Sequence, residues 1–183
     1  MADGTRQLPT EIKRGTYSVL VENEPGVLSR IAGLFSARGY NIISLSVGET
    51  MDPTVSRMTI VAEGTISVLE QINKQLNKLI PVISVKNMHE GEFVSRELML
   101  VKISKTDKAL KYLQDFWNKH NWQVVDESPE HLVVQAVGST AENQVMLGEL
   151  KPFDISEISR TGQVAMSKKY KVGAVDKNTP VQH

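Results

Sequence analysis

The chain has 183 residues, with 21 basic and 21 acidic side chains and no cysteine. Balanced charge provides no general electrostatic attraction to nucleic acid, and the lack of cysteine excludes disulfides, thiol catalysis and thiolate metal sites. No apolar run approaches the roughly 20 residues that span a bilayer, and the polar N-terminus lacks the apolar core of a secretory signal. We therefore expect a cytoplasmic protein, without a membrane or nucleic-acid partner, that forms one large or two small domains.

The first half of the chain alternates between strand and helix patterns. Apolar side chains recur at every second position in four segments, which predicts strands over residues 17–22, 41–47, 56–62 and 82–85. Helical spacing predicts one helix over residues 27–38 and another that Pro81 ends. The order βαββαβ predicts a ferredoxin-like domain, with both helices on one face of a four-stranded antiparallel sheet.

The same order of elements recurs in the second half. Strands are predicted over residues 98–103, 122–125, 132–137 and 153–158, with helices between them. Ser139, with Glu142 three residues later, predicts a capping box, and Pro152 ends the helix that follows. The predicted fold is therefore α+β, with two ferredoxin-like βαββαβ domains. We expect a disordered lead over 1–15, domains over 16–88 and 96–167, a hinge over 89–95 and a polar tail over 168–183.

A short turn, Asn23-Glu24-Pro25-Gly26, joins the first strand to the first helix. Pro25 suits the first position of a helix, because proline has no N–H and its φ is already helical. The free N–H groups and partial positive charge of a helix N-terminus can bind a small carboxylate, here beside the amide of Asn23. The alternative, a structural turn that binds nothing, has the same features and stays open.

Residues that could carry catalysis do not form a recognisable motif. No two histidines are spaced for a helical metal site, and there is no nucleophile elbow, P-loop or dinucleotide fingerprint. Glu97 and Asp126 have no evident acid–base partner, so we expect surface or ion-pair roles for them. RNA-recognition modules share the βαββαβ order but need exposed sheet aromatics, which the predicted central strand around Met58-Thr59-Ile60 lacks. No catalytic residue, metal or cofactor is predicted.

A small sheet that is covered on one side leaves its edges unpaired. Side-by-side dimerisation can join two such edges into one longer sheet. In such a dimer the turn over residues 23–26 of one copy would face its partner, and a small ligand could lie between them.

Several ordered segments resemble one known family. In the first domain they are Asn23-Glu24-Pro25-Gly26-Val27-Leu28-Ser29-Arg30 with Ile31-Ala32-Gly33-Leu34-Phe35, then Arg38-Gly39-Tyr40-Asn41-Ile42, then Ser56-Arg57-Met58-Thr59. In the second half they are Arg96-Glu97-Leu98-Met99-Leu100-Val101-Lys102, Val124-Val125-Asp126, and Arg160-Thr161-Gly162 with Val164, Ala165 and Ser167. Over about residues 16 to 167, the chain resembles the regulatory (small) subunit of acetohydroxyacid synthase, also called acetolactate synthase. The first domain is similar to its ACT domain.

The resemblance implies a non-catalytic subunit that stimulates a separate, thiamine-diphosphate-dependent catalytic subunit in branched-chain amino-acid biosynthesis. It also implies feedback inhibition by valine, or another branched-chain amino acid, bound between the ACT domains of a homodimer. By the same resemblance, Asn23 and Asn41 would orient the amino acid by hydrogen bonds. The backbone around Gly26, Val27 and Leu28 would take its carboxylate, and Ile42 would line the side-chain pocket.

Two other classes of protein are alternatives to a regulatory subunit. An ACT-type amino-acid-sensing module of a transcription regulator would need a DNA-binding element, for which both predicted tails are too short. A free-standing enzyme on a ferredoxin-like fold would need a catalytic cluster.

Overall fold

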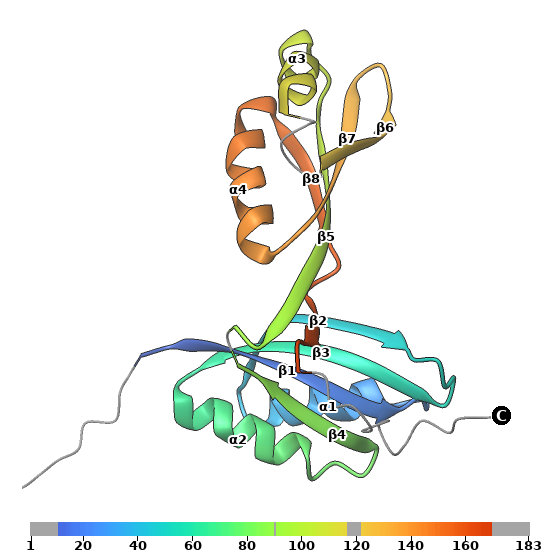
Figure 1. Ribbon diagram of the computed structural model, residues 1–183, viewed down its shortest axis with the longest axis vertical. Helices are drawn as coiled ribbons and strands as arrows, with labels where there is room; N and C mark the ends of the chain where they lie inside the picture. Colours follow the sequence, from blue (N-terminus) through green and yellow to red (C-terminus); the bar gives the residue numbers. More distant parts are fainter. Residues whose placement is uncertain (1–10, 90, 117–121, 170–183) are drawn as a thin grey trace, which may run out of the picture. The chain divides into compact units, whose positions relative to one another are not determined.

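The structure is a computed structural model that describes residues 11–89, 91–116 and 122–169 (Figure 1). Its contacts divide the chain into two compact units, with the boundary between Phe93 and Val94. Residues 94–166 form the second unit, and the described residues 167–169 group with the first.

The first unit has the predicted βαββαβ order. Its elements are β1 (Lys13–Glu22), α1 (Val27–Ala37), β2 (Asn41–Glu49), β3 (Val55–Gly64), α2 (Ile66–Leu76) and β4 (Val82–Met88). The strands form one antiparallel sheet in the order β2-β3-β1-β4, and Figure 1 shows α1 and α2 on the same side of it. The ferredoxin-like prediction for this half is therefore confirmed, and β2 and β4 are the edge strands.

Tyr17 fixes the second helix of this unit to the sheet. Its ring is fully buried among apolar side chains of β1, β3, α1 and α2, and its hydroxyl donates a hydrogen bond of 2.7 Å to the Leu69 carbonyl. Burial raises the pKa of the Tyr17 phenol to about 12, because the charged phenolate would lose its hydration. The buried tyrosine is thus a neutral link between β1 and α2.

The first unit differs from the prediction in the bounds of several elements and in the register of β2. β1 begins at Lys13, inside the lead predicted over residues 1–15, because β3 continues to Gly64 and pairs with it there; residues 1–10 lie outside the described part of the chain. α2 ends at Leu76, five residues before Pro81, where the side-chain amide of Asn77 bonds back to the Asn73 carbonyl at 2.8 Å. In β2 a register shift between Ile42 and Ser44 interrupts the predicted alternation, so that Ile43 is 40% exposed.

The second unit repeats the order of elements. It contains β5 (Phe93–Ser104), α3 (Asp107–Phe116), β6 (Trp122–Glu127), β7 (His131–Gly138), α4 (Thr140–Leu150), a 3₁₀ turn (Lys151–Phe153), β8 (Ile155–Arg160) and β9 (Val164–Ser167). The sheet order is β6-β7-β5-β8, and β9 also pairs with β5. Residues of α3 and α4 pack with β5 and β7 in one core. The prediction of a second ferredoxin-like layer is confirmed, with β9 as an addition.

The start of α4 has the predicted capping box. The Ser139 hydroxyl accepts the Glu142 N–H at 3.2 Å, and the Glu142 carboxylate accepts the Ser139 N–H at 2.6 Å. These bonds from Ser139 lower the pKa of Glu142. The buried face of α4 runs through Asn143, Met146 and Leu150, whereas Val145 is 57% exposed.

The end of the second unit differs most from the prediction. β8 starts at Ile155 rather than at residue 153, because the 3₁₀ turn continues α4 and Asp154 then takes a left-handed φ of 52°.

The start of the second unit also differs from the prediction. β5 begins at Phe93, inside the hinge predicted over 89–95, and its pairing with β9 was not predicted. Residue 90 of the predicted hinge, residues 117–121 and the predicted tail beyond Lys169 lie outside the described residues.

Candidate functional site

The turn between β1 and α1 is held by three backbone hydrogen bonds. The Glu22 N–H donates to the Pro81 carbonyl at 2.9 Å, and the Asn23 N–H donates to the Thr54 carbonyl at 2.7 Å. The Val27 N–H donates to the Glu24 carbonyl at 3.3 Å and so closes the turn itself. The position of the helix N-terminus is therefore tied to both neighbouring loops of the sheet.

Gly26 is the N-cap of α1, and the helix begins at Val27, as predicted. The φ of Gly26 is 87°, in the left-handed region, so Pro25 lies before the helix and not at its first position. A residue with a Cβ is strained at such a φ, whereas glycine is not. An ideal Cβ at Gly26 would meet no atom within 4 Å, so the position restricts backbone conformation rather than volume.

The N-terminus of α1 carries free hydrogen-bond donors. It has no side-chain cap and no acidic residue in its first turn. The N–H groups of Leu28 and Ser29 have no acceptor among the described residues, as expected for the first turn of a helix. Val27 directs its side chain into the core and Leu28 is 47% exposed. The helix therefore offers backbone donors and partial positive charge to a small anion.

Asn23 lies beside these donors and contacts the loop between β2 and β3. Its Nδ2 donates to Glu49 Oε1 at 3.1 Å and to the Pro53 carbonyl at 2.9 Å. Since both acceptors fix the amide orientation, Oδ1 is the atom that remains to accept a bond from a ligand. In the same loop, hydrogen bonds from the hydroxyl and N–H of Thr54 lower the pKa of Asp52.

Glu49 was missed by the sequence interpretation. It lies at the end of β2, 26 residues after Asn23, and nothing in the local pattern of β2 connects the two. Its carboxylate adds a negative charge beside the Asn23 amide. Together, the helix N-terminus and this pair supply donors for a carboxylate and acceptors for an ammonium group.

The other two predicted ligand residues, Asn41 and Ile42, lie at the opposite end of β2. Asn41 is exposed and pairs with Glu63, whereas Glu49 pairs with Ser56 at the far end of the strand. Eight residue steps separate Asn41 from Glu49, which is about 26 Å in an extended strand. Ile42 packs against the core of the first unit. A single chain therefore brings Asn23, Gly26, Val27 and Leu28 together but leaves Asn41 and Ile42 apart from them.

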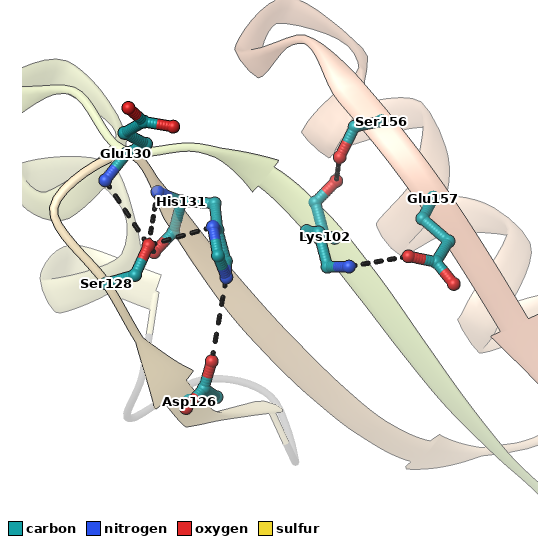
Figure 2. A network of polar contacts seen from close by, with 7 residues as sticks. All are labelled: Lys102, Asp126, Ser128, Glu130, His131, Ser156 and Glu157. Carbon is teal, nitrogen blue, oxygen red and sulfur yellow. Dashed lines mark hydrogen bonds and ion pairs between the residues drawn. The ribbon is translucent and has the colours of Figure 1, made fainter.

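A second cluster, in the hairpin between β6 and β7, has the side chains of a catalytic triad (Figure 2). Ser128 Oγ lies 2.8 Å from His131 Nδ1, and His131 Nε2 lies 3.6 Å from Asp126 Oδ2. The serine oxygen, however, accepts the N–H groups of Glu130 at 3.3 Å and His131 at 3.0 Å. It therefore stabilises the turn, and the exposed Asp126 side chain matches the surface role predicted for it.

The described residues contain neither a cluster of metal ligands nor a membrane-spanning helix. No group of three or more histidine, aspartate or glutamate side chains is arranged to hold a metal ion in that part of the chain. None of the helices over the described ranges is both long enough and apolar enough to cross a membrane.

Comparisons with known proteins identify both halves of the chain. Residues 17–84 match the family of AHAS small subunit-like ACT domains, and residues 96–169 match the family described as small subunit of acetolactate synthase. The chain is 44% identical over 152 residues to a probable acetolactate synthase small subunit of Methanothermobacter thermautotrophicus, covering 82% of this chain and 90% of the relative. It is 42% identical over 160 residues to the acetolactate synthase isozyme 3 small subunit of Escherichia coli, covering 87% and 98%.

A solved structure extends the match to the fold. The crystal structure of the acetolactate synthase small subunit from Thermotoga maritima aligns with a TM-score of 0.76 and 31% identity, over 87% of this chain and 99% of that one. The family models, the relatives and the solved structure all indicate an acetolactate synthase small subunit, and together they cover both units. The chain therefore belongs to the acetolactate synthase small-subunit family, and its first unit is an ACT domain.

Proposed function

We propose that this chain is the non-catalytic regulatory partner of a thiamine-diphosphate-dependent acetolactate synthase catalytic subunit in the cytoplasm. It stimulates that subunit and confers feedback inhibition by valine, or another branched-chain amino acid, in branched-chain amino-acid biosynthesis. The observation that carries the sensing role is the turn over residues 23–28. There, free helix donors lie beside the acceptors of Asn23 and Glu49, an arrangement that suits a zwitterion.

The proposal includes a homodimer in which the ligand lies between two copies. β2 is an edge strand, and its two ends carry the two separated halves of the predicted site. If β2 pairs antiparallel with β2 of a second copy about a two-fold axis, Asn41 of one copy approaches the Asn23 turn of the other. The dimer would complete the ligand site, which explains why a single chain does not bring these residues together.

The proposed role as a sensing module of a transcription regulator is not favoured. The relatives named as small subunits are covered over 90% and 98% of their lengths, so the similarity includes the second unit and extends beyond an isolated ACT domain.

Reconstitution tests the proposal directly. The purified chain is added to its catalytic subunit, and acetolactate formation is measured with and without valine. The chain alone should form no product, the mixture should exceed the catalytic subunit alone, and valine should reverse the gain. Equal rates with and without a saturating amount of the chain would contradict the regulatory role. Sedimentation of the full chain at micromolar concentration tests the dimer, which a monomer both with and without valine would contradict.

A further inference from the structure

An open hollow of about 460 Å³ lies between α1 and the turn that joins α2 to β4. We name it the α1–turn hollow. Its lining residues are Arg30, Leu34, Lys78, Leu79, Ile80 and Pro81. Its surface is mainly apolar and open to solvent, which suits the side chain of a macromolecular partner better than an enclosed small molecule.

Ile80 is the most exposed apolar residue of this hollow. The side chain is 90% exposed, although the flanking Pro81 is buried. The turn that presents it is fixed by hydrogen bonds from the Leu79 N–H to the Leu76 carbonyl at 3.2 Å and from the Val82 N–H to the Leu79 carbonyl at 3.0 Å. A large aliphatic side chain on such a fixed turn can be buried by a partner at little cost in backbone ordering.

The charged residues that line the hollow are all positive. Its two charged lining residues, Arg30 and Lys78, are both cations, are exposed, and form no ion pair with a described residue. A partner that covers the hollow must therefore bring carboxylates near an apolar side chain.

A symmetric contact between two copies does not supply this complement, and neither do the terminal segments. A two-fold contact through the hollow would place the same cations opposite one another, which is repulsive. The terminal segments are not acidic either: residues 170–183 contain Lys171, Asp176 and Lys177, and residues 1–10 contain Asp3 and Arg6. The occupant is therefore a different macromolecule.

The hollow is connected to the ligand turn by two backbone hydrogen bonds. The Arg30 N–H donates to the Gly26 carbonyl at 3.0 Å, and the Pro81 carbonyl accepts the Glu22 N–H at 2.9 Å. We infer that the α1–turn hollow is a docking surface for the catalytic subunit, and that it receives an acidic segment with an apolar anchor side chain. This inference rests on the proposed function. It places partner docking and amino-acid binding on the same helix, so that a ligand at one site can bias the other.

Ile80→Asp tests the surface, because it removes the anchor and places a negative charge where the partner's carboxylates would lie. Binding of the full chain to the purified catalytic subunit is measured by sedimentation, and stimulation is measured separately. We expect the dissociation constant to rise at least tenfold, about 1.4 kcal/mol. Met51→Asp is the matched control, since Met51 is 98% exposed in a loop of the same unit but does not line the hollow.

A charge variant tests the second part of the inference. Wild-type binding should weaken as ionic strength rises, and Arg30→Gln combined with Lys78→Gln should flatten this dependence, because the screened attraction has been removed. Circular dichroism and the self-association of each variant serve as folding controls.

The outcomes separate the two proposals. Wild-type binding without stimulation would contradict the proposed function and leave the docking surface to be decided by the variants. Unchanged binding of folded Ile80→Asp, or an equal loss in Met51→Asp, would overturn the docking surface alone, whereas no wild-type binding at all would overturn both proposals.

Discussion

The side-chain amide of Asn23 donates a hydrogen bond of 3.1 Å to the carboxylate of Glu49 and so joins the turn before α1 to the end of β2. A second bond from the same nitrogen to the Pro53 carbonyl, at 2.9 Å, uses its other hydrogen. The amide oxygen and the Glu49 carboxylate are then the acceptors nearest to the helix N-terminus. If the proposed site binds a zwitterionic amino acid, we expect its ammonium group at the Asn23–Glu49 pair and its carboxylate at the helix N-terminus.

Glu49→Gln should therefore weaken valine inhibition. The change keeps the size of the side chain but removes the negative charge, and a hydrogen bond to a charged group contributes about 1.5–3 kcal/mol. We expect the inhibitory concentration of valine for the reconstituted enzyme to rise about tenfold or more. Asn23→Ala should weaken it by a smaller factor, since a neutral hydrogen bond contributes about 0.5–1.5 kcal/mol. Glu70→Gln, on the exposed surface of α2, is the control, and equal inhibition in all of these proteins would contradict the assignment.

Gly26→Asp should abolish valine inhibition. Because residue 26 has a left-handed φ of 87°, the aspartate also strains the backbone there. Gly26→Asn is the matched control, because asparagine has nearly the same shape, tolerates the left-handed region and carries no charge. Both variants should lose roughly 1 kcal/mol of stability. Like charges about 4 Å apart repel by about 4 kcal/mol at an effective dielectric of 20, so only the aspartate should repel the ligand carboxylate.

The expected difference between the two variants is at least tenfold in valine affinity, about 1.4 kcal/mol. Valine titration of the reconstituted enzyme measures it, and circular dichroism confirms that both proteins fold. Equal affinities for Gly26→Asp and Gly26→Asn would show that the ligand carboxylate does not bind at this turn.

Local patterns were sufficient to predict most of the fold. Helical spacing predicted α1 to within one residue of its end, and the capping box at Ser139 was read from two side chains three positions apart. Gly39 has the left-handed φ, 64°, that the end of α1 requires. Each of these features depends on interactions within a few residues, which is the range over which a sequence pattern is informative.

The features that were missed depend on residues distant in the sequence. Glu49 reaches the candidate site through a loop that no spacing rule connects to Asn23. Asn143 is polar and interrupts the apolar pattern of α4, yet it is 1% exposed, because its partner is on β5. The placement of Pro25 at the first helical position was wrong, because Gly26 takes a left-handed conformation between Pro25 and the start of α1.

Asn143→Ala should destabilise the second unit. Asn143 Nδ2 donates to the Glu97 carbonyl at 3.1 Å and to Glu97 Oε2 at 3.3 Å, while Arg160 Nη1 lies 3.9 Å from the same carboxylate oxygen. Removing the amide takes one donor from the Glu97 carbonyl and one from its buried carboxylate, which costs about 1–3 kcal/mol. Urea denaturation measures the loss, and Gln144→Ala, exposed on the same helix, should cost much less. Similar losses in both variants would show that Glu97 does not depend on Asn143.

The last prediction concerns Tyr17 and alkaline pH. Its phenol has a pKa raised by burial from 10.0 to about 12, so the folded state holds the proton more tightly than the unfolded state. The stability that this confers is fully present below pH 10 and is lost as pH rises toward 12. One pH unit above the ordinary value, the wild type should have lost about 1.4 kcal/mol through this group.

Tyr17→Phe isolates this contribution. The variant cannot ionise at this position, but it leaves the Leu69 carbonyl without its 2.7 Å donor, which costs roughly 1 kcal/mol near neutral pH. The wild type should therefore be the more stable protein at pH 8, and its advantage should vanish near pH 11, because only the wild type loses the buried neutral phenol. Tyr112, whose pKa is also raised to about 12 by burial and by Glu149, is present in both proteins and cancels in the difference. Urea denaturation followed by circular dichroism at both pH values tests this, and a stability difference that stays constant would show that Tyr17 does not titrate in this range.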